Sequence, residues 1–207
     1  MLIQEINSHE SVGGRNIYSA IYATLLQLKP KNCLEIGTFH GYSAAVFQKY
    51  FDEFCPDGKL ITCDIKSYVD LSQYKNVEQV IVRPYVDNSE QWHYVKNSEL
   101  KAQTNSGIDN AAIVKSLFEE DFDFCFLDGD HQLTSVVQDF VFARELLKQP
   151  QYILFDDTEE VGQTVKTSVH DSVRYFYEEI TMDTNIEYYN FKNWQSFVGA
   201  ALIWNKQ

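Results

Sequence analysis

The sequence predicts one α/β domain built on a doubly wound, mostly parallel sheet. Apolar β-rich runs alternate with amphipathic helical patterns, and the coarse order is strand–helix repeated five times, followed by two strands. Alternation of this kind is typical of parallel strands joined by helices that cover both faces of a sheet. The two final strand patterns have no helix between them, so we expect an antiparallel hairpin at one edge.

The first half of the chain contains three of the predicted strands. The predicted elements are a helix from Arg15 to Lys29, ended by Pro30, a strand from Asn32 to Ile36, a helix from Tyr42 to Phe51, and strands from Lys59 to Cys63 and from Val77 to Val82. Residues 1–30 are therefore expected to form a helical segment packed on a domain of residues 31–207. The stretch from Pro84 to Asn110 is polar and aperiodic, which predicts a short helix and a mobile loop.

The second half contains the remaining strands. The predicted elements are a helical pattern from Ile113 to Phe118, a strand from Phe122 to Leu127, a helix from Thr134 to Lys148 closed by Pro150, a strand from Tyr152 to Phe155, a helix from Val161 to Glu178, and strands from Ile186 to Phe191 and from Phe197 to Trp204. In the helix that begins at Thr134, the residues expected near one stripe are Val137, Phe140, Val141, Arg144 and Leu147.

Composition narrows the class of protein. A chain of 207 residues with 44% hydrophobic and 23% charged residues is ordinary for one globular domain. No apolar run approaches the ~18 residues of a membrane span, and the N-terminus lacks a basic region followed by an apolar stretch, so we expect a cytoplasmic protein without a membrane partner. A formal charge of −13 argues against nucleic acid as a partner. The oligomeric state stays open, and a homo-oligomer is compatible with the sequence.

Acidic residues and glycines at the ends of the first two strands indicate a ligand site. In a doubly wound sheet the ligand lies beyond the carboxyl ends of the strands, where Glu35, Gly37 and Asp64 fall. The turn from Gly37 to Gly41 allows close approach of the backbone and exposes N–H groups at the start of a helix. Asp64, after the second strand, is placed to accept the hydrogen bonds of a ribose diol. The sequence therefore predicts a nucleoside-cofactor site.

The spacing of this turn separates two kinds of cofactor. Nicotinamide-binding turns have the pattern G-x-G-x-x-G, whereas this chain has E-x-G-x-x-x-G. An acid at Glu35 would repel a pyrophosphate but would suit a cofactor that bears sulfonium and ammonium groups. The run Leu34-Glu35-Ile36-Gly37-Thr38-Phe39-His40-Gly41-Tyr42-Ser43 resembles the first motif of class I S-adenosylmethionine-dependent methyltransferases, L-E-I-G-x-x-x-G-x-S.

This resemblance implies a Rossmann-like methyltransferase fold, with seven strands in the order 3-2-1-4-5-7-6 and a C-terminal antiparallel hairpin. It implies S-adenosylmethionine as the cofactor. The cofactor-binding residues that it implies are Glu35, Gly37, Thr38, Gly41, Ser43, Asp64 and Asp128.

A second acidic cluster follows two later strands. Asp128-Gly129-Asp130-His131 and Asp156-Asp157 end neighbouring strands, which lie about 4.8 Å apart. Carboxylates at short range repel one another unless a proton or a cation intervenes, and their hard oxygens suit Mg²⁺ or Ca²⁺. The sequence therefore predicts a metal site at Asp128, Asp156 and Asp157. The alternative is that these residues have only structural roles. Asp130, and Asp157 or Thr158, would then cap the following helices, and His131 would be a residue at the start of a helix.

The same residues resemble the macrocin/sugar O-methyltransferase-like and catechol O-methyltransferase-like branches. That resemblance implies catalytic roles for Asp128 and His131, with Mg²⁺ on the acids and His131 as general base. It also implies a small-molecule acceptor, a sugar or an aromatic compound. Three alternatives stay open: a non-catalytic protein that binds S-adenosylmethionine or S-adenosylhomocysteine, a nicotinamide-dependent oxidoreductase, and a protein or RNA methyltransferase. The turn spacing and the final hairpin disfavour the oxidoreductase.

Overall fold

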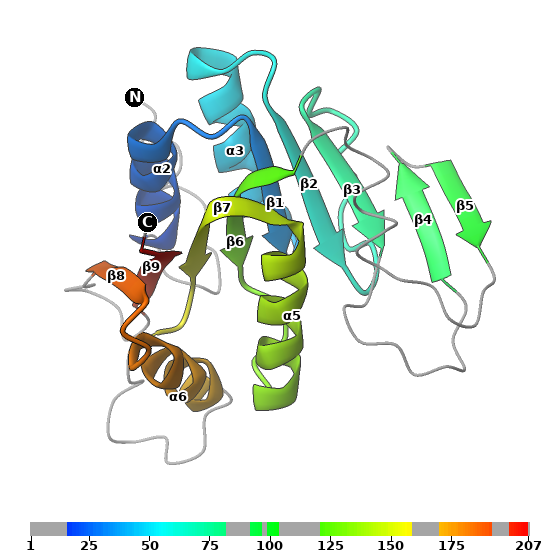
Figure 1. The fold of residues 1–207 in the computed structure, drawn as a ribbon. Coiled ribbons are helices and arrows are strands. Elements are labelled where there is room, and N and C mark those ends of the chain that lie inside the picture. The colour runs from blue at the N-terminus through cyan, green and yellow to red at the C-terminus, as the bar shows by residue number, and fades with distance from the viewer. Residues whose placement is uncertain are drawn as a thin grey trace.

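A seven-stranded sheet forms the centre of the molecule (Figure 1). The computed structural model describes residues 16–81, 92–96, 99–103, 121–158, 170–191 and 199–206. The strands of this sheet are β1 (Asn32–Ile36), β2 (Lys59–Asp64), β3 (Val77–Ile81), β6 (Phe122–Leu127), β7 (Leu147–Phe155), β8 (Ile186–Phe191) and β9 (Ala200–Asn205). Their order is β3-β2-β1-β6-β7-β9-β8, and β9 runs antiparallel to both of its neighbours. The predicted fold class and strand order are confirmed.

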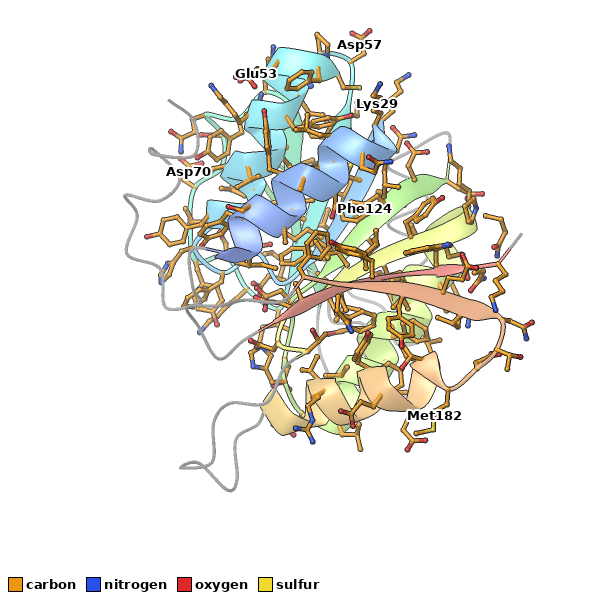
Figure 2. All side chains as sticks on the ribbon, turned by 90° about the vertical axis from the view of Figure 1, so that its left-hand side faces the viewer. Lys29, Glu53, Asp57, Asp70, Phe124 and Met182 are labelled. Atoms are coloured by element: carbon orange, nitrogen blue, oxygen red, sulfur yellow. The ribbon has the colours of Figure 1, made fainter. Side chains whose placement is uncertain are left out.

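Helices cover both faces of the sheet, as Figure 2 shows with the sheet between two helical layers. The helices α2 (Asn16–Leu28) and α3 (Tyr42–Phe54) pack on one face, where Cys33 and Phe124 are buried. The helices α5 (Leu133–Leu146) and α6 (His170–Thr181) pack on the other face, where Leu34 and Ile36 are buried. Alternate residues of β1 thus contribute to different cores, as the two-residue period of a strand requires.

The polar stretch between β3 and β6 contains a hairpin that the sequence analysis did not predict. Within its described residues, β4 (Trp92–Lys96) and β5 (Glu99–Gln103) pair antiparallel as a separate two-stranded sheet. The described residues of this stretch form strands, and the rest of the stretch, where the expected short helix and loop would fall, lies outside the described residues. The sequence of β4, Trp-His-Tyr-Val-Lys, is rich in residues that favour strands, but the polar residues around it hide this preference.

The junction of α5 and β7 also differs from the prediction. The helix ends at Leu146, and Leu147 pairs with Phe122 at the start of β6. Pro150, predicted to close the helix, lies within β7 beside a register shift between Phe122 and Phe124. Pairing with β6 therefore decides where the strand begins, and the local proline signal does not.

The predicted stripe of α5 is wrong at three positions, because Val137, Val141 and Arg144 are exposed; Phe140 is buried as predicted, and Leu147 lies in β7. Val137 and Val141 are 36% and 49% exposed, and the buried line consists of Val136, Phe140 and Ala143. This line follows the i, i+4, i+7 spacing from Val136, one residue earlier than predicted.

Several predicted elements fall partly or wholly outside the described residues. They are the first half of the segment predicted for residues 1–30, the end of the strand predicted to Val82, the helical pattern from Ile113 to Phe118, the first part of the helix predicted from Val161, and the first residues of the strand predicted from Phe197. None of the helices in the described part of the chain combines the length and apolar content needed to cross a membrane.

Candidate functional site

The turn after β1, from Gly37 to Gly41, is packed tightly against the end of β6. Gly37 has a φ of 101°, and its N–H donates to the carbonyl of Cys63 at 2.8 Å. A Cβ on Gly37 would lie only 1.8 Å from the carbonyl oxygen of Asp128, so no side chain fits. Gly41 has a φ of 73°, and a Cβ there would meet Leu71 at 2.6 Å. Gly37 therefore lets the ends of β1 and β6 meet, and Gly41 leaves room for Leu71 from the segment between β2 and β3. Any contact of Gly37 with a ligand comes from its backbone.

Asp64 is held at the carboxyl end of β2 by two backbone groups. The N–H of Phe39 donates to Oδ2 at 2.8 Å, and the N–H of Ile65 donates to Oδ1 at 2.6 Å. The side chain is thereby fixed beside the turn after β1. Each carboxylate oxygen has capacity for a further donor, because an ionised carboxylate offers about four acceptor positions.

Glu35 is a fully buried acid on β1. The Thr62 hydroxyl donates to Oε2, while Oε1 is buried and has no hydrogen bond of good geometry. Burial raises the pKa of Glu35 to about 7, and the charge of Asp64 adds to this rise, although the nearby hydroxyls of Ser43 and Thr62 oppose it. The fold thus places a carboxyl group with one unpartnered oxygen beneath the turn.

Two threonines connect this acid to the turn. Thr38 is 2% exposed, and its hydroxyl oxygen lies 2.6 Å from that of the fully buried Thr62. Sequence reasoning missed Thr62. The available signal was a polar residue inside the otherwise apolar run Leu60-Ile61-Thr62-Cys63, but its partner could not be identified without the strand register.

The second acidic cluster brings three side chains together. His131 Nε2 lies 3.2 Å from Asp157 Oδ2 and 3.6 Å from Asp128 Oδ1. One potential ligand atom from each of the three residues lies within 4.8 Å of the others. Asp157 adopts a φ of 57°, in the left-handed region, which turns the chain at the end of β7.

Asp156 lies outside this three-residue group, although it was predicted to bind metal. Its Oδ1 accepts the N–H of Asp157 at 2.9 Å. Burial raises the pKa of Asp156 well above its usual range, and the charges of Asp128 and Asp157 add to the rise. Burial together with Asp157 and Glu35 raises the pKa of Asp128 in the same way. Carboxyl groups are therefore crowded at the ends of β6 and β7, and burial favours their protonated forms.

The loop between β6 and α5 is supported from the helix. Asp130 Oδ2 accepts the hydroxyl of Ser135 at 2.7 Å, and the N-cap residue of α5 is Gln132, so Asp130 is not the N-cap. Asp139 Oδ2 occupies the space beside Gly129, where a Cβ would lie 2.5 Å away. Burial, with the charges of Asp130 and Asp64, raises the pKa of Asp139 to about 7.

Asp139 was also missed, although it falls on the buried side of α5. The alternative in which Asp157 or Thr158 caps the next helix concerns a helix start that lies outside the described residues.

Exposed apolar side chains lie beside Asp64. Ile65 follows it directly and is 50% exposed. Phe39 and Tyr68 are about as exposed, and their ring centroids are 5.3 Å apart in an edge-to-face arrangement. Lys66 Nζ lies 4.4 Å from the centre of the Tyr68 ring. The site thus has an apolar border that the sequence motifs did not reveal.

Comparisons with known proteins agree with this architecture. A family described as a methyltransferase domain matches residues 34–158. The comparison with curated proteins gave no match. Among solved structures, the chain is similar to the O-methyltransferase from Bacillus cereus in complex with SAH (S-adenosylhomocysteine), at 16% identity over 99% of this chain and 89% of that chain, with a TM-score of 0.60.

Two further solved structures share the fold. The O-methyltransferase TomG from Streptomyces achromogenes, involved in tomaymycin synthesis and solved with SAM (S-adenosylmethionine), has 14% identity over 99% of this chain and 89% of that chain, with a TM-score of 0.62. The SAH-bound methyltransferase PaMTH1 from Podospora anserina has 15% identity over 99% of this chain and 86% of that chain, with a TM-score of 0.56. Identities of this size show a shared fold only.

Proposed function

This chain belongs to the methyltransferase-domain family that matches residues 34–158, and from that premise we propose that it transfers a methyl group from S-adenosylmethionine to a hydroxyl group of a small molecule. The observation that carries the proposal is the arrangement around the turn after β1. Asp64 binds the turn through the Phe39 N–H, Glu35 lies buried beneath it, and Asp128 packs against Gly37.

The residues around the turn fit S-adenosylmethionine. Glu35 Oε1 is buried without a hydrogen-bond partner, and a cationic group of the cofactor would supply one. Asp64 can accept the ribose hydroxyls, and the exposed side chain of Ile65 offers an apolar surface to adenine. The other residues of the proposed cofactor site, which contribute backbone or hydroxyl groups, are Gly37, Thr38, Gly41, Ser43 and Asp128.

The acids at the ends of β6 and β7 fit a divalent cation. We assign Asp128, Asp156 and Asp157 as its ligands, because their crowded carboxyl groups repel one another and their oxygens suit Mg²⁺. When bound, Mg²⁺ lowers the pKa of the acceptor hydroxyl. His131 is then left as the general base, because a nitrogen that ligates the ion cannot also accept a proton.

In the proposed reaction, His131 Nε2 takes the proton of the acceptor hydroxyl. The hydroxyl oxygen forms a bond to the methyl carbon while the carbon–sulfur bond breaks, which gives a methyl ether and S-adenosylhomocysteine. The main task of the chain is to hold the two reactants in line, since correct positioning lowers the barrier of a two-reactant step.

Calorimetric titration with S-adenosylhomocysteine tests the cofactor site. Asp64→Ala is expected to weaken binding at least about tenfold, because a ribose hydroxyl loses a charged acceptor. The matched control is Asp57→Ala, at the opposite end of β2, and it is expected to bind like the parent; Figure 2 labels this position. Unchanged affinity in Asp64→Ala would refute the site assignment.

A thermal-denaturation series with Mg²⁺ and with a chelator tests the metal site. Mg²⁺ is expected to raise the Tm of the parent and not that of Asp157→Asn. Asp130→Asn is the control, because Asp130 bonds to Ser135 and lies outside the ligand set. If Mg²⁺ does not change the Tm of the parent, the metal is removed from the proposal.

Cofactor binding without methyl transfer to any sugar or aromatic hydroxyl would favour the non-catalytic binding protein.

A further inference from the structure

We infer that Thr62 is a positioning residue for the cofactor, because its hydroxyl joins the turn after β1 to Glu35 and leaves a single Glu35 oxygen to meet the cofactor's ammonium group. Thr62 lies inside β2, is fully buried, and belongs to no motif of the sequence. The inference rests on the proposed function, since it concerns how this chain prepares its cofactor site.

The hydrogen bonds at Thr62 have a defined direction when Glu35 is ionised. A threonine hydroxyl has one proton to donate. Thr62 donates that proton to Glu35 Oε2, so the 2.6 Å contact between the two threonine hydroxyls must be donated by Thr38. The chain of donors therefore runs from Thr38 in the turn, through Thr62 on β2, to Glu35 on β1.

The strand register explains why these groups meet. Glu35 and Thr62 are paired positions of the parallel strands β1 and β2, so their side chains lie on the same face of the sheet. Each is flanked by apolar residues that point to the opposite face. A buried hydroxyl is stable there only because both of its hydrogen-bonding functions are used.

Strand β2 holds two successive residues of the turn. Thr62 binds the side chain of Thr38, and Asp64, two residues further on the same face, binds the N–H of Phe39. Removal of the Thr62 hydroxyl would release Thr38 and leave both Glu35 oxygens without a donor from β2. The turn and the acid would then lose their common support.

The charges near Glu35 make the hydrogen bond from Thr62 important for cofactor binding. The ionisable groups that act on Glu35, or on which it acts, come from neighbouring strand ends and strands: Asp64, Asp128, Cys63 and Cys125. The charge of Asp64 raises the pKa of Glu35, and the charge of Glu35 raises the pKa of Asp128, Cys63 and Cys125. The hydroxyls of Ser43 and Thr62 oppose this effect and lower the pKa of Glu35. Only the ionised acid attracts an ammonium group, so the hydroxyl of Thr62 extends binding to lower pH.

The test compares Thr62→Val with Thr62→Ser by calorimetry with S-adenosylhomocysteine between about pH 6 and pH 8.5. Thr62→Val is expected to bind at least about tenfold more weakly at neutral pH, with the loss growing as the pH falls. Thr62→Ser restores the hydroxyl and is expected to bind within about threefold of the parent. Thr24→Val is the matched control, because Thr24 is a buried threonine on α2 whose hydroxyl has no partner.

A second measurement separates this inference from the proposed function. Carbon-13 NMR titration of the free protein, with Glu35→Gln to assign the carboxyl resonance, should show a higher midpoint for Glu35 in Thr62→Val than in the parent. A parent that does not bind S-adenosylhomocysteine overturns the proposed function, and an unchanged Glu35 midpoint in Thr62→Val overturns the role of Thr62. Equal affinity of Thr62→Val and the parent at every pH overturns it as well.

Discussion

Glu35 shows how a single residue can serve a site at the expense of the fold. An ionised carboxylate that is fully buried, with one oxygen unpartnered, is destabilising unless a cation or a donor compensates it. The hydroxyls of Ser43 and Thr62 stabilise the carboxylate in part, and Oε1 still has no hydrogen-bond partner. A carboxyl group kept in this state is typical of a ligand site, where the missing partner arrives with the ligand.

Replacement of Glu35 by Gln should therefore change how stability depends on pH. The folded pKa of about 7 lies above the ordinary value of 4.5, so the folded parent retains its proton longer than the unfolded chain and loses stability as the pH rises between these values. Glu35→Gln lacks this loss. Its free energy of unfolding, relative to the parent, is expected to rise by about 3 kcal/mol between about pH 4 and pH 8, measured by urea denaturation.

Asp139→Asn provides the comparison, because the pKa of Asp139 is also raised to about 7 by burial. Both variants should gain stability relative to the parent with rising pH, while only Glu35→Gln should weaken binding of S-adenosylhomocysteine. A difference from the parent that stays constant with pH would contradict the burial of an ionisable Glu35.

At the scale of elements, α5 separates a buried line from an exposed one. Val136 is 1% exposed and its neighbour Val137 is 36% exposed, although both are valines in the same helix. We expect Val136→Ala to lower the free energy of unfolding by about 1–3 kcal/mol, because a buried cavity forms. Val137→Ala should change it by less than about 0.5 kcal/mol, measured by chemical denaturation. The reverse order would show that α5 is rotated on the sheet.

Strands β1 and β6 are joined at their amino ends by Asp123. Its Oδ2 accepts the N–H groups of Lys31 and Asn32 at 2.7 and 2.8 Å, and Lys148 forms an ion pair with it. Burial by itself would raise the pKa of Asp123, but the hydrogen bonds of Lys148 and the two backbone N–H groups outweigh it and lower the pKa.

The stabilisation from Asp123 is therefore present above the ordinary pKa of 3.8 and is lost as the pH falls through the lower, folded value. Asp123→Asn is expected to lose about 1–3 kcal/mol of unfolding free energy at neutral pH and progressively less in acid, measured by urea denaturation. Asp121→Asn, at an exposed position nearby, should have no such effect. An Asp123→Asn difference that persists unchanged in acid would show that the charge is not responsible.

For the whole molecule, the strand order could be predicted because each strand and helix carries its own periodicity and their alternation restricts the topology. The hairpin β4–β5 could not be predicted, since the polar residues around it mask its short strand patterns. The acids at strand ends were found because each lies at the end of an apolar strand pattern, and Glu35 and Asp128 also have a glycine nearby. Thr62 and Asp139 were not found, because their partners lie on other elements and only the strand register and the packing of α5 bring them together.

The most direct test of the whole account is calorimetric titration of the full chain with S-adenosylhomocysteine and, separately, with NADH. The arrangement of Glu35 and Asp64 around the turn after β1 predicts saturable binding of one S-adenosylhomocysteine per chain and no binding of NADH. Binding of NADH without binding of S-adenosylhomocysteine would contradict the account and would assign the turn to a pyrophosphate-bearing cofactor.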